Sequence, residues 1–136
     1  MNSTAITNTI LAFYPNIEAI YLFGTYQTED EWPESDVDIA LLFPPGPAKL
    51  IRDLPFGDCC IVLTDVLKKD IDLVNLRIVH TVLQHEIIQT GRIIYMKDEY
   101  TIDLFEMIVM SLYQKLNEER AGILKEIYQS GRILNV

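Results

Sequence analysis

The hydrophobic positions of this 136-residue chain follow a helical period in some segments and a strand-like pattern in others. In the first segment, Ile6, Ile10 and Leu11 share one face at helical spacing, which predicts a helix that ends before Pro15. The later elements follow from the same patterns. They are strands at 17–23 and 36–43, a helix at 58–69, a strand at 70–76, a helix at 79–90, a short strand at 92–95 and a long helix over about 98–130.

The strands expected at 17–23 and 36–43 are joined by a polar, acidic loop. The second of them is apolar from Ile39 onward, which is typical of a central strand that is buried on both faces. The proline-rich stretch 44–47 ends this strand, and residues 48–54 are expected to form a short helical turn.

Start and stop signals bound the later helices. Asp58 is a candidate N-cap for the helix at 58–69, and Gly91 is expected at the C′ position after the helix at 79–90. In the last helix, an apolar stripe predicts a face that packs in the core or against a second chain, and Gly122 is expected to mark a break. The stripe comprises Ile102, Phe105, Ile108, Val109, Leu112, Leu116, Ile123 and Ile127.

Together these elements predict an α+β domain with a small mixed β-sheet flanked by helices and a long C-terminal helical segment. With 136 residues, of which 49% are hydrophobic, the chain can bury one core and is short for two. We therefore expect residues 1–96 to form the core and residues 97–136 to form a helical extension packed on the same single domain.

The charge distribution is strongly uneven. The net charge is −9, and residues 1–48 contain no Lys or Arg. Because a surface this acidic repels phosphate backbones, we expect no direct nucleic-acid binding. It can instead hold divalent cations or face a basic protein partner, although solubility alone also explains it.

Neither a membrane segment nor a secretory leader is indicated. There is no run of eighteen apolar residues, and no basic region precedes an apolar stretch at the N-terminus. The only cysteines, Cys59 and Cys60, are neighbours, a spacing that suits neither a relaxed disulfide nor a metal site. We expect reduced thiols and a cytoplasmic protein.

Paired aspartates are the clearest candidate for chemistry. Asp36 and Asp38 lie two apart at the start of an expected strand, so their side chains project from the same face. Two carboxylates that repel one another are best explained by a shared Mg²⁺ ion, which takes oxygen ligands and substrate phosphates. Asp72, on the expected strand at 70–76, would complete such a site, and Asp70 could share its face.

Gly24 and Thr25, just upstream, suit a phosphate-binding turn. A glycine lets the backbone approach a phosphate closely, and the Thr25 hydroxyl with nearby N–H groups can hold its oxygens. Phosphates on this turn and metal on the aspartates would form a nucleoside triphosphate site, with two ions serving the attacking oxygen and the leaving pyrophosphate. Each motif alone is common in proteins without such a site, so the prediction depends on their combination.

The combination resembles a known signature. Gly24-Thr25, ten residues and then Asp36-Val37-Asp38 are similar to the Gly-Ser-x10-Asp-x-Asp signature of the polymerase-β-type nucleotidyltransferases. The third acidic residue of that superfamily corresponds to Asp72 in "DIDLVNL". The segment "LQHEIIQTGRIIY" resembles one common in the small MNT-type branch. This resemblance implies a nucleotidyltransferase fold and ATP as substrate, with two Mg²⁺ ions.

The MNT-type branch is often paired with HEPN-domain proteins as toxin and antitoxin. The resemblance implies an antitoxin that transfers AMP from ATP to a tyrosine of a HEPN ribonuclease toxin and forms a hetero-oligomer with it. One alternative is an antitoxin that only binds the toxin and has a vestigial site. A third reading, a small-molecule nucleotidyltransferase of the aminoglycoside type, would need a substrate domain for which the chain is short.

Two departures from the family pattern bear on activity. Thr25 replaces the usual serine, and the loop that follows lacks the Arg and Gly that many relatives carry. A cation that assists the triphosphate would then come from elsewhere, with Lys49, Arg52 and Arg77 as the open choices.

Overall fold

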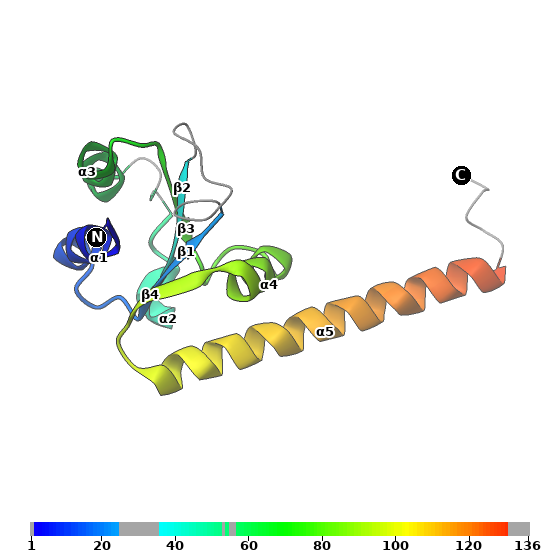
Figure 1. Ribbon diagram of the computed structural model, residues 1–136. Coiled ribbons are helices and arrows are strands. Elements are labelled where there is room, and N and C mark those ends of the chain that lie inside the picture. The colour runs from blue at the N-terminus through cyan, green and yellow to red at the C-terminus, as the bar shows by residue number, and fades with distance from the viewer. Residues whose placement is uncertain (1, 25–35, 53, 55–56, 131–136) are drawn as a thin grey trace.

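The computed structural model describes residues 2–24, 36–52, 54 and 57–130, in which a mixed β-sheet carries helices on both faces (Figure 1). In chain order, the elements are α1 (Asn2–Phe13), β1 (Ala19–Phe23), β2 (Val37–Leu42), α2 (Pro45–Ala48), α3 (Asp58–Leu67), β3 (Ile71–Asn75), α4 (Thr81–Thr90), β4 (Arg92–Met96) and α5 (Glu99–Ser130). This order confirms the expected α+β class.

The described strands form one four-stranded sheet in the order β3-β2-β1-β4. β1 pairs antiparallel with β2 and with β4, whereas β2 and β3 are parallel, so the sheet is mixed as expected. β2 is central, and all its residues except Asp38 are buried. Its near-continuous apolar run follows from this position, because helices cover both of its faces.

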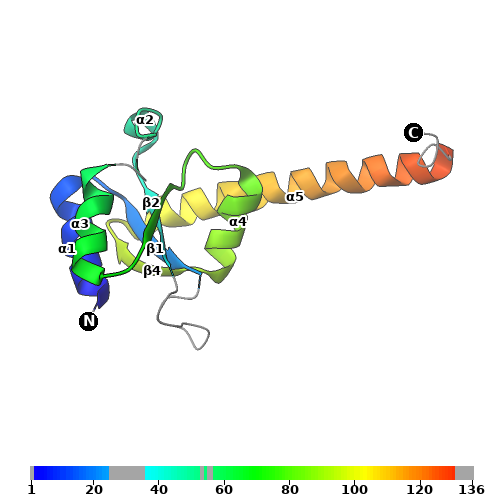
Figure 2. The ribbon, with the colours of Figure 1, turned by 90° about the horizontal axis from the view of Figure 1, so that it is seen from above.

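Two apolar cores lie on the two faces of the sheet. α1 and α3 cover one face, and α4 with the first part of α5 covers the other (Figures 1 and 2). Successive strand residues point to opposite faces. Val37 and Ile39 accordingly pack in the α1–α3 core, and Ala40 and Leu42 pack in the α4–α5 core.

The last helix, α5, is continuous and projects well beyond the sheet and α4 (Figures 1 and 2). The expected break at Gly122 is wrong. A single glycine in a helix costs only ~1 kcal/mol relative to alanine, too little to interrupt a helix of 32 residues. None of the described helices, α5 included, has both the length and the apolarity that crossing a membrane requires.

Three local boundaries differ from the expected ones. The helical turn expected at 48–54 begins earlier, as α2, because proline fits the first turn of a helix, where its missing N–H is not needed. Gly57 is the N-cap of α3, and Asp58 lies in the first turn, where its charge suits the helix dipole.

Gly91 is the C-cap of α4 rather than the C′ residue, and its backbone is extended, with φ at −80°. A Cβ atom here would crowd the carbonyl oxygens of Ile87 and Leu22. The glycine is therefore required mainly by the last turn of α4, and the approach to β1 tightens the position further.

Candidate functional site

The start of the parallel β2–β3 pair places two predicted site residues side by side. Asp38 lies directly opposite Asp72 in the strand register. Both project from the face that carries Ala40 and Val74, which belong to the α4–α5 core. The sheet therefore brings together carboxylates that are 34 residues apart in the sequence.

Asp36 stands just before β2 and is exposed. It precedes Asp38 by two residues, and its charge acts on the Asp38 carboxyl. The carbonyl oxygen of Asp70 accepts a hydrogen bond from the Val37 N–H at 2.9 Å. This bond ties the beginnings of the two strands together and fixes the spacing of the aspartates that follow.

The Asp38 carboxyl is electrostatically strained. Burial, and then the charges of Asp72 and Asp36, raise its pKa above the ordinary value. Each cause disfavours the carboxylate form, and a bound cation would oppose all of them. A carboxyl group whose ionised form is disfavoured in this way, at one end of a sheet, is typical of a functional site.

Gly24 directly follows β1 and lies beside this carboxyl group. Its φ angle is +77°, a backbone conformation that residues with a Cβ atom rarely adopt. A Cβ atom added here would collide with Oδ2 of Asp38. The glycine therefore brings the backbone into direct contact with the carboxylate, as a phosphate-binding turn next to a metal site requires. Thr25 lies outside the described residues.

The donor set suits Mg²⁺ in its chemistry. Within residues 2–24, 36–52, 54 and 57–130, no group of three or more His, Cys, Asp or Glu side chains is arranged to hold a metal ion as it stands. The register nevertheless pairs Asp38 with Asp72, and Asp36 adds a third negative charge. Carboxylate oxygens are the ligands that Mg²⁺ prefers, with substrate phosphates completing its coordination.

Arg77 lies at the opposite end of the sheet and is not placed to assist a triphosphate. It follows Asp72 by five residues, ~16 Å of extended strand. Its guanidinium donates to Oε2 of Glu18 at 2.7 Å and to the carbonyl oxygen of Phe43. Both partners are mostly buried, so Arg77 joins the end of β3 to the chain before β1.

Lys49 and Arg52 are held at that same end. The Asn75 side-chain amide donates to the carbonyl oxygens of Ala48 and Ile51, at 3.0 and 2.9 Å. These bonds fix the segment that carries both cations at the carboxyl end of β3, whereas Asp72 is near its amino end. All three candidate cations are therefore distant from the paired aspartates.

One neighbour of the site was not expected from the sequence. Cys60 is buried on α3, and its thiol donates to the carbonyl oxygen of Ile71, which precedes Asp72. Burial and the charge of Asp72 raise the pKa of this thiol, against a hydrogen bond from Thr64. The apolar spacing of α3 was the available signal, since it places Cys60 on the face that packs against β3.

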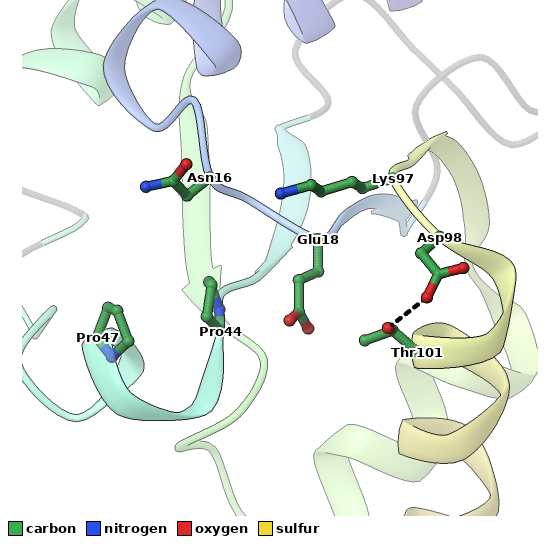
Figure 3. A pocket seen from close by; sticks show the side chains of 7 residues that line it. All are labelled: Asn16, Glu18, Pro44, Pro47, Lys97, Asp98 and Thr101. Carbon is green, nitrogen blue, oxygen red and sulfur yellow. Dashed lines mark hydrogen bonds between the residues drawn. The ribbon is translucent and has the colours of Figure 1, made fainter.

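A cavity of about 490 Å³ lies away from the aspartates (Figure 3). Its lining includes Glu18, Lys97 and Asp98, and Thr101 donates to Asp98 at 2.8 Å. Glu18 pairs with Arg77 and marks the end of the sheet opposite Asp38. This cavity is therefore separate from the candidate active site.

Comparisons with known proteins agree with the geometry. The family model described as polymerase beta, nucleotidyltransferase matches residues 6–100. Among curated proteins, the protein adenylyltransferase MntA of Shewanella oneidensis is 29% identical over 127 residues, which cover 93% of this chain and 88% of MntA.

Solved structures show the same fold over nearly the whole chain. A toxin–antitoxin crystal structure with AMP-PNP matches with a TM-score of 0.78 and 28% identity, covering 94% of this chain and 99% of the other. A structure of tri-AMPylated Shewanella oneidensis HEPN toxin in complex with its MNT antitoxin matches with a TM-score of 0.73 and 28% identity, covering 93% and 96%.

Proposed function

Because the chain belongs to the polymerase beta nucleotidyltransferase family, we propose that it is an antitoxin that adenylylates its toxin. It transfers AMP from ATP to a tyrosine of a HEPN ribonuclease toxin and thereby neutralises it. The similarity to MntA, which is named a protein adenylyltransferase, supports this activity. The similarity to complexes that contain AMP-PNP or an AMPylated HEPN toxin supports the substrate and the partner.

The observation that carries the proposal is the pairing of Asp38 with Asp72 beside the positive-φ turn at Gly24. This pairing places carboxylates next to a backbone turn on one face of the sheet. A nucleotidyl transfer needs such an arrangement, because its transition state concentrates negative charge on phosphate oxygens and the carboxylates can hold the Mg²⁺ that offsets this charge.

Each predicted site residue has a role in this reaction. Asp36, Asp38 and Asp72 would hold Mg²⁺, with two ions expected, and Gly24 and Thr25 would hold the triphosphate. The bound metal supplies positive charge that offsets the charge of the phosphates. Asp72 also accepts the proton of the tyrosine hydroxyl. The tyrosine oxygen bonds to the α-phosphorus, the bond to the β-phosphate bridge breaks, and pyrophosphate leaves.

The acidic surface suits this partner. The net charge of −9 is complementary to a basic, RNA-binding ribonuclease and would speed its association. The proposed setting is the cytoplasm, where ATP is available and where Cys59 and Cys60 stay as free thiols.

The test is to incubate the chain with ATP, Mg²⁺ and the HEPN protein encoded by the neighbouring gene, and to measure the intact mass of that protein. We expect one or more additions of the mass of AMP, with loss of ribonuclease activity. Asp38→Asn should abolish the addition without unfolding the chain. An unmodified toxin that is nevertheless neutralised by wild type and by Asp38→Asn alike would sink the proposal.

One observation favours a second candidate, an antitoxin that acts by occlusion alone. Lys49, Arg52 and Arg77, the three cations considered for the triphosphate, all lie away from the paired aspartates. Neutralisation that persists after ATP is removed would support occlusion. Neutralisation that requires ATP would exclude it.

A further inference from the structure

The apolar stripe of α5 continues past the part of the helix that the domain covers. The residues 102, 105, 109, 112, 116, 120, 123 and 127 recur at spacings of three and four, so they lie along one face of the helix. Ile102, Phe105 and Val109 of this face are buried in the α4–α5 core. The same face then extends ~27 Å from Val109 to Ile127, at 1.5 Å per residue.

Beyond Val109 this face is largely exposed. Leu112, Ile123 and the adjacent Leu124 are 48%, 58% and 55% exposed. An isolated helical segment of this length is marginally stable in water, because most helical stability in proteins comes from packing of the apolar face. The projecting half of α5 therefore presents a surface suited to another chain.

Pairing of two copies through this face is disfavoured by its charge. Arg120 lies in the middle of the stripe, between Leu116 and Ile123. In a two-fold arrangement of antiparallel helices centred there, the residue on the axis meets its own copy. Two arginines would then face each other inside an apolar seam, where like charges are costly.

The relatives indicate another occupant. The match to the toxin–antitoxin structure with AMP-PNP covers 94% of this chain. That is about 128 of the 136 residues, which leaves about eight residues of this chain unmatched. The stretch that follows Val109 is longer than that, so most of the projecting half of α5 has a counterpart in a chain solved in a toxin–antitoxin structure. The helix is thus kept in proteins that have this partner.

The orientation of the stripe also fits the reaction. The buried half of the stripe faces α4 and the sheet face that carries Asp38 and Asp72. Figure 1 shows α5 extending past α4 on this side of the sheet. A protein seated on the exposed half would lie beyond α4, over the same face of the sheet as the one that carries the two aspartates.

We propose that the exposed half of the stripe, which includes Leu112 and Ile123, together with the adjacent Leu124, is the surface on which the HEPN toxin docks. This inference rests on the proposed function. A helix of the toxin would lay its apolar face on the stripe, with an acidic side chain opposite Arg120. Docking there holds the toxin while its tyrosine enters the site.

The test compares Ile123→Glu/Leu124→Glu with Met107→Glu, a control whose side chain is 60% exposed on the opposite face of the same helix. Binding to the neighbouring-gene HEPN protein is measured by titration calorimetry, and AMP addition by mass at several toxin concentrations. We expect the double variant to bind at least about tenfold more weakly and to recover AMP addition at high toxin concentration. The control should match wild type.

Equal binding by the double variant and the control would overturn the docking surface while leaving the proposed function intact. Failure of the proposed function looks different, because wild type would then bind the toxin without adding AMP. Sedimentation of the antitoxin alone provides a further check. A wild-type dimer that becomes monomeric in the double variant, with toxin binding unchanged, would show that the stripe pairs two copies instead and would refute the proposal.

Discussion

Replacing Gly24 by alanine tests the contact on which the candidate site is built. The residue has a φ angle of +77°, and the new Cβ atom would collide with Oδ2 of Asp38. The substitution adds one methyl group, changes no charge and leaves both aspartates in place. Its effects therefore report on the shape of the turn and on the position of the Asp38 carboxyl.

The magnitude follows from two costs. A residue with a Cβ atom in the left-handed region is less favourable than glycine by ~1 kcal/mol. Moving the Asp38 side chain out of the collision adds about 1 kcal/mol if it must leave its rotamer. We expect a total loss of ~2 kcal/mol in the free energy of unfolding. We also expect AMP transfer to fall by at least about 100-fold, because a carboxylate displaced by about 1 Å no longer meets its ligand.

Gly122→Ala is the matched control, because a Cβ atom added at Gly122 meets nothing within 4 Å. In the middle of α5 this substitution should stabilise the chain by ~0.5–1 kcal/mol and leave AMP transfer unchanged. The assays are urea denaturation and the mass of the modified toxin. The reasoning is refuted if Gly24→Ala retains wild-type stability and wild-type transfer.

Three further outcomes are expected. Arg77→Ala should lower the free energy of unfolding, measured in urea, by ~1–3 kcal/mol, because it leaves the mostly buried Glu18 without its partner. The rate of AMP transfer per folded molecule should stay unchanged. A lower rate with unchanged stability would instead place Arg77 in the active site. Asp38→Asn should abolish transfer and stabilise the metal-free chain. Folding raises the pKa of Asp38, so the ionised carboxyl destabilises the folded wild type. This penalty is absent below the ordinary pKa near 4, grows with pH up to the raised pKa and is constant above it. A difference in the free energy of unfolding between the two proteins that does not change with pH across this range would contradict the prediction. Burial raises the pKa of Cys59 to about 11, so at pH 7 its thiol should react with Ellman's reagent only after unfolding, and prompt reaction in the native protein would show that it is not buried as described.

Local patterns were enough to predict the elements and the class of the fold. The run from Ile39 onward correctly indicated a central strand, since only a strand covered on both faces has no need for polar alternation. The aspartates were predicted to share a face because the strand period is two, and the register of β2 with β3 then placed Asp38 opposite Asp72. The assignment of the five site residues to metal and nucleotide remains a prediction.

What the sequence could not predict depends on contacts between distant segments. Arg77 was an open choice for the triphosphate, and only the fold shows that Glu18, 59 residues away, holds it at the other end of the sheet. Gly91 was expected as a helix-terminating glycine, and the last turn of α4, through the Ile87 carbonyl oxygen, does exclude a Cβ atom there, but the second close contact, with Leu22 of β1, could not be predicted from the sequence. Gly122 was expected to break α5, because the low helix propensity of glycine can be read from the sequence. The length of the continuous helix around it could not be read in the same way. The division of the chain near residue 96 also remains a prediction.

The most direct test of the account follows the label of ATP into the toxin. The chain, Mg²⁺ and the HEPN protein are incubated with ATP labelled either at the α-phosphate or at the γ-phosphate, and the label on the toxin is counted. Transfer of AMP retains only the α-phosphate on the tyrosine, so the account expects label from α-labelled ATP and none from γ-labelled ATP, and neither with Asp38→Asn. Label from γ-labelled ATP, or a toxin neutralised without any label, would contradict it.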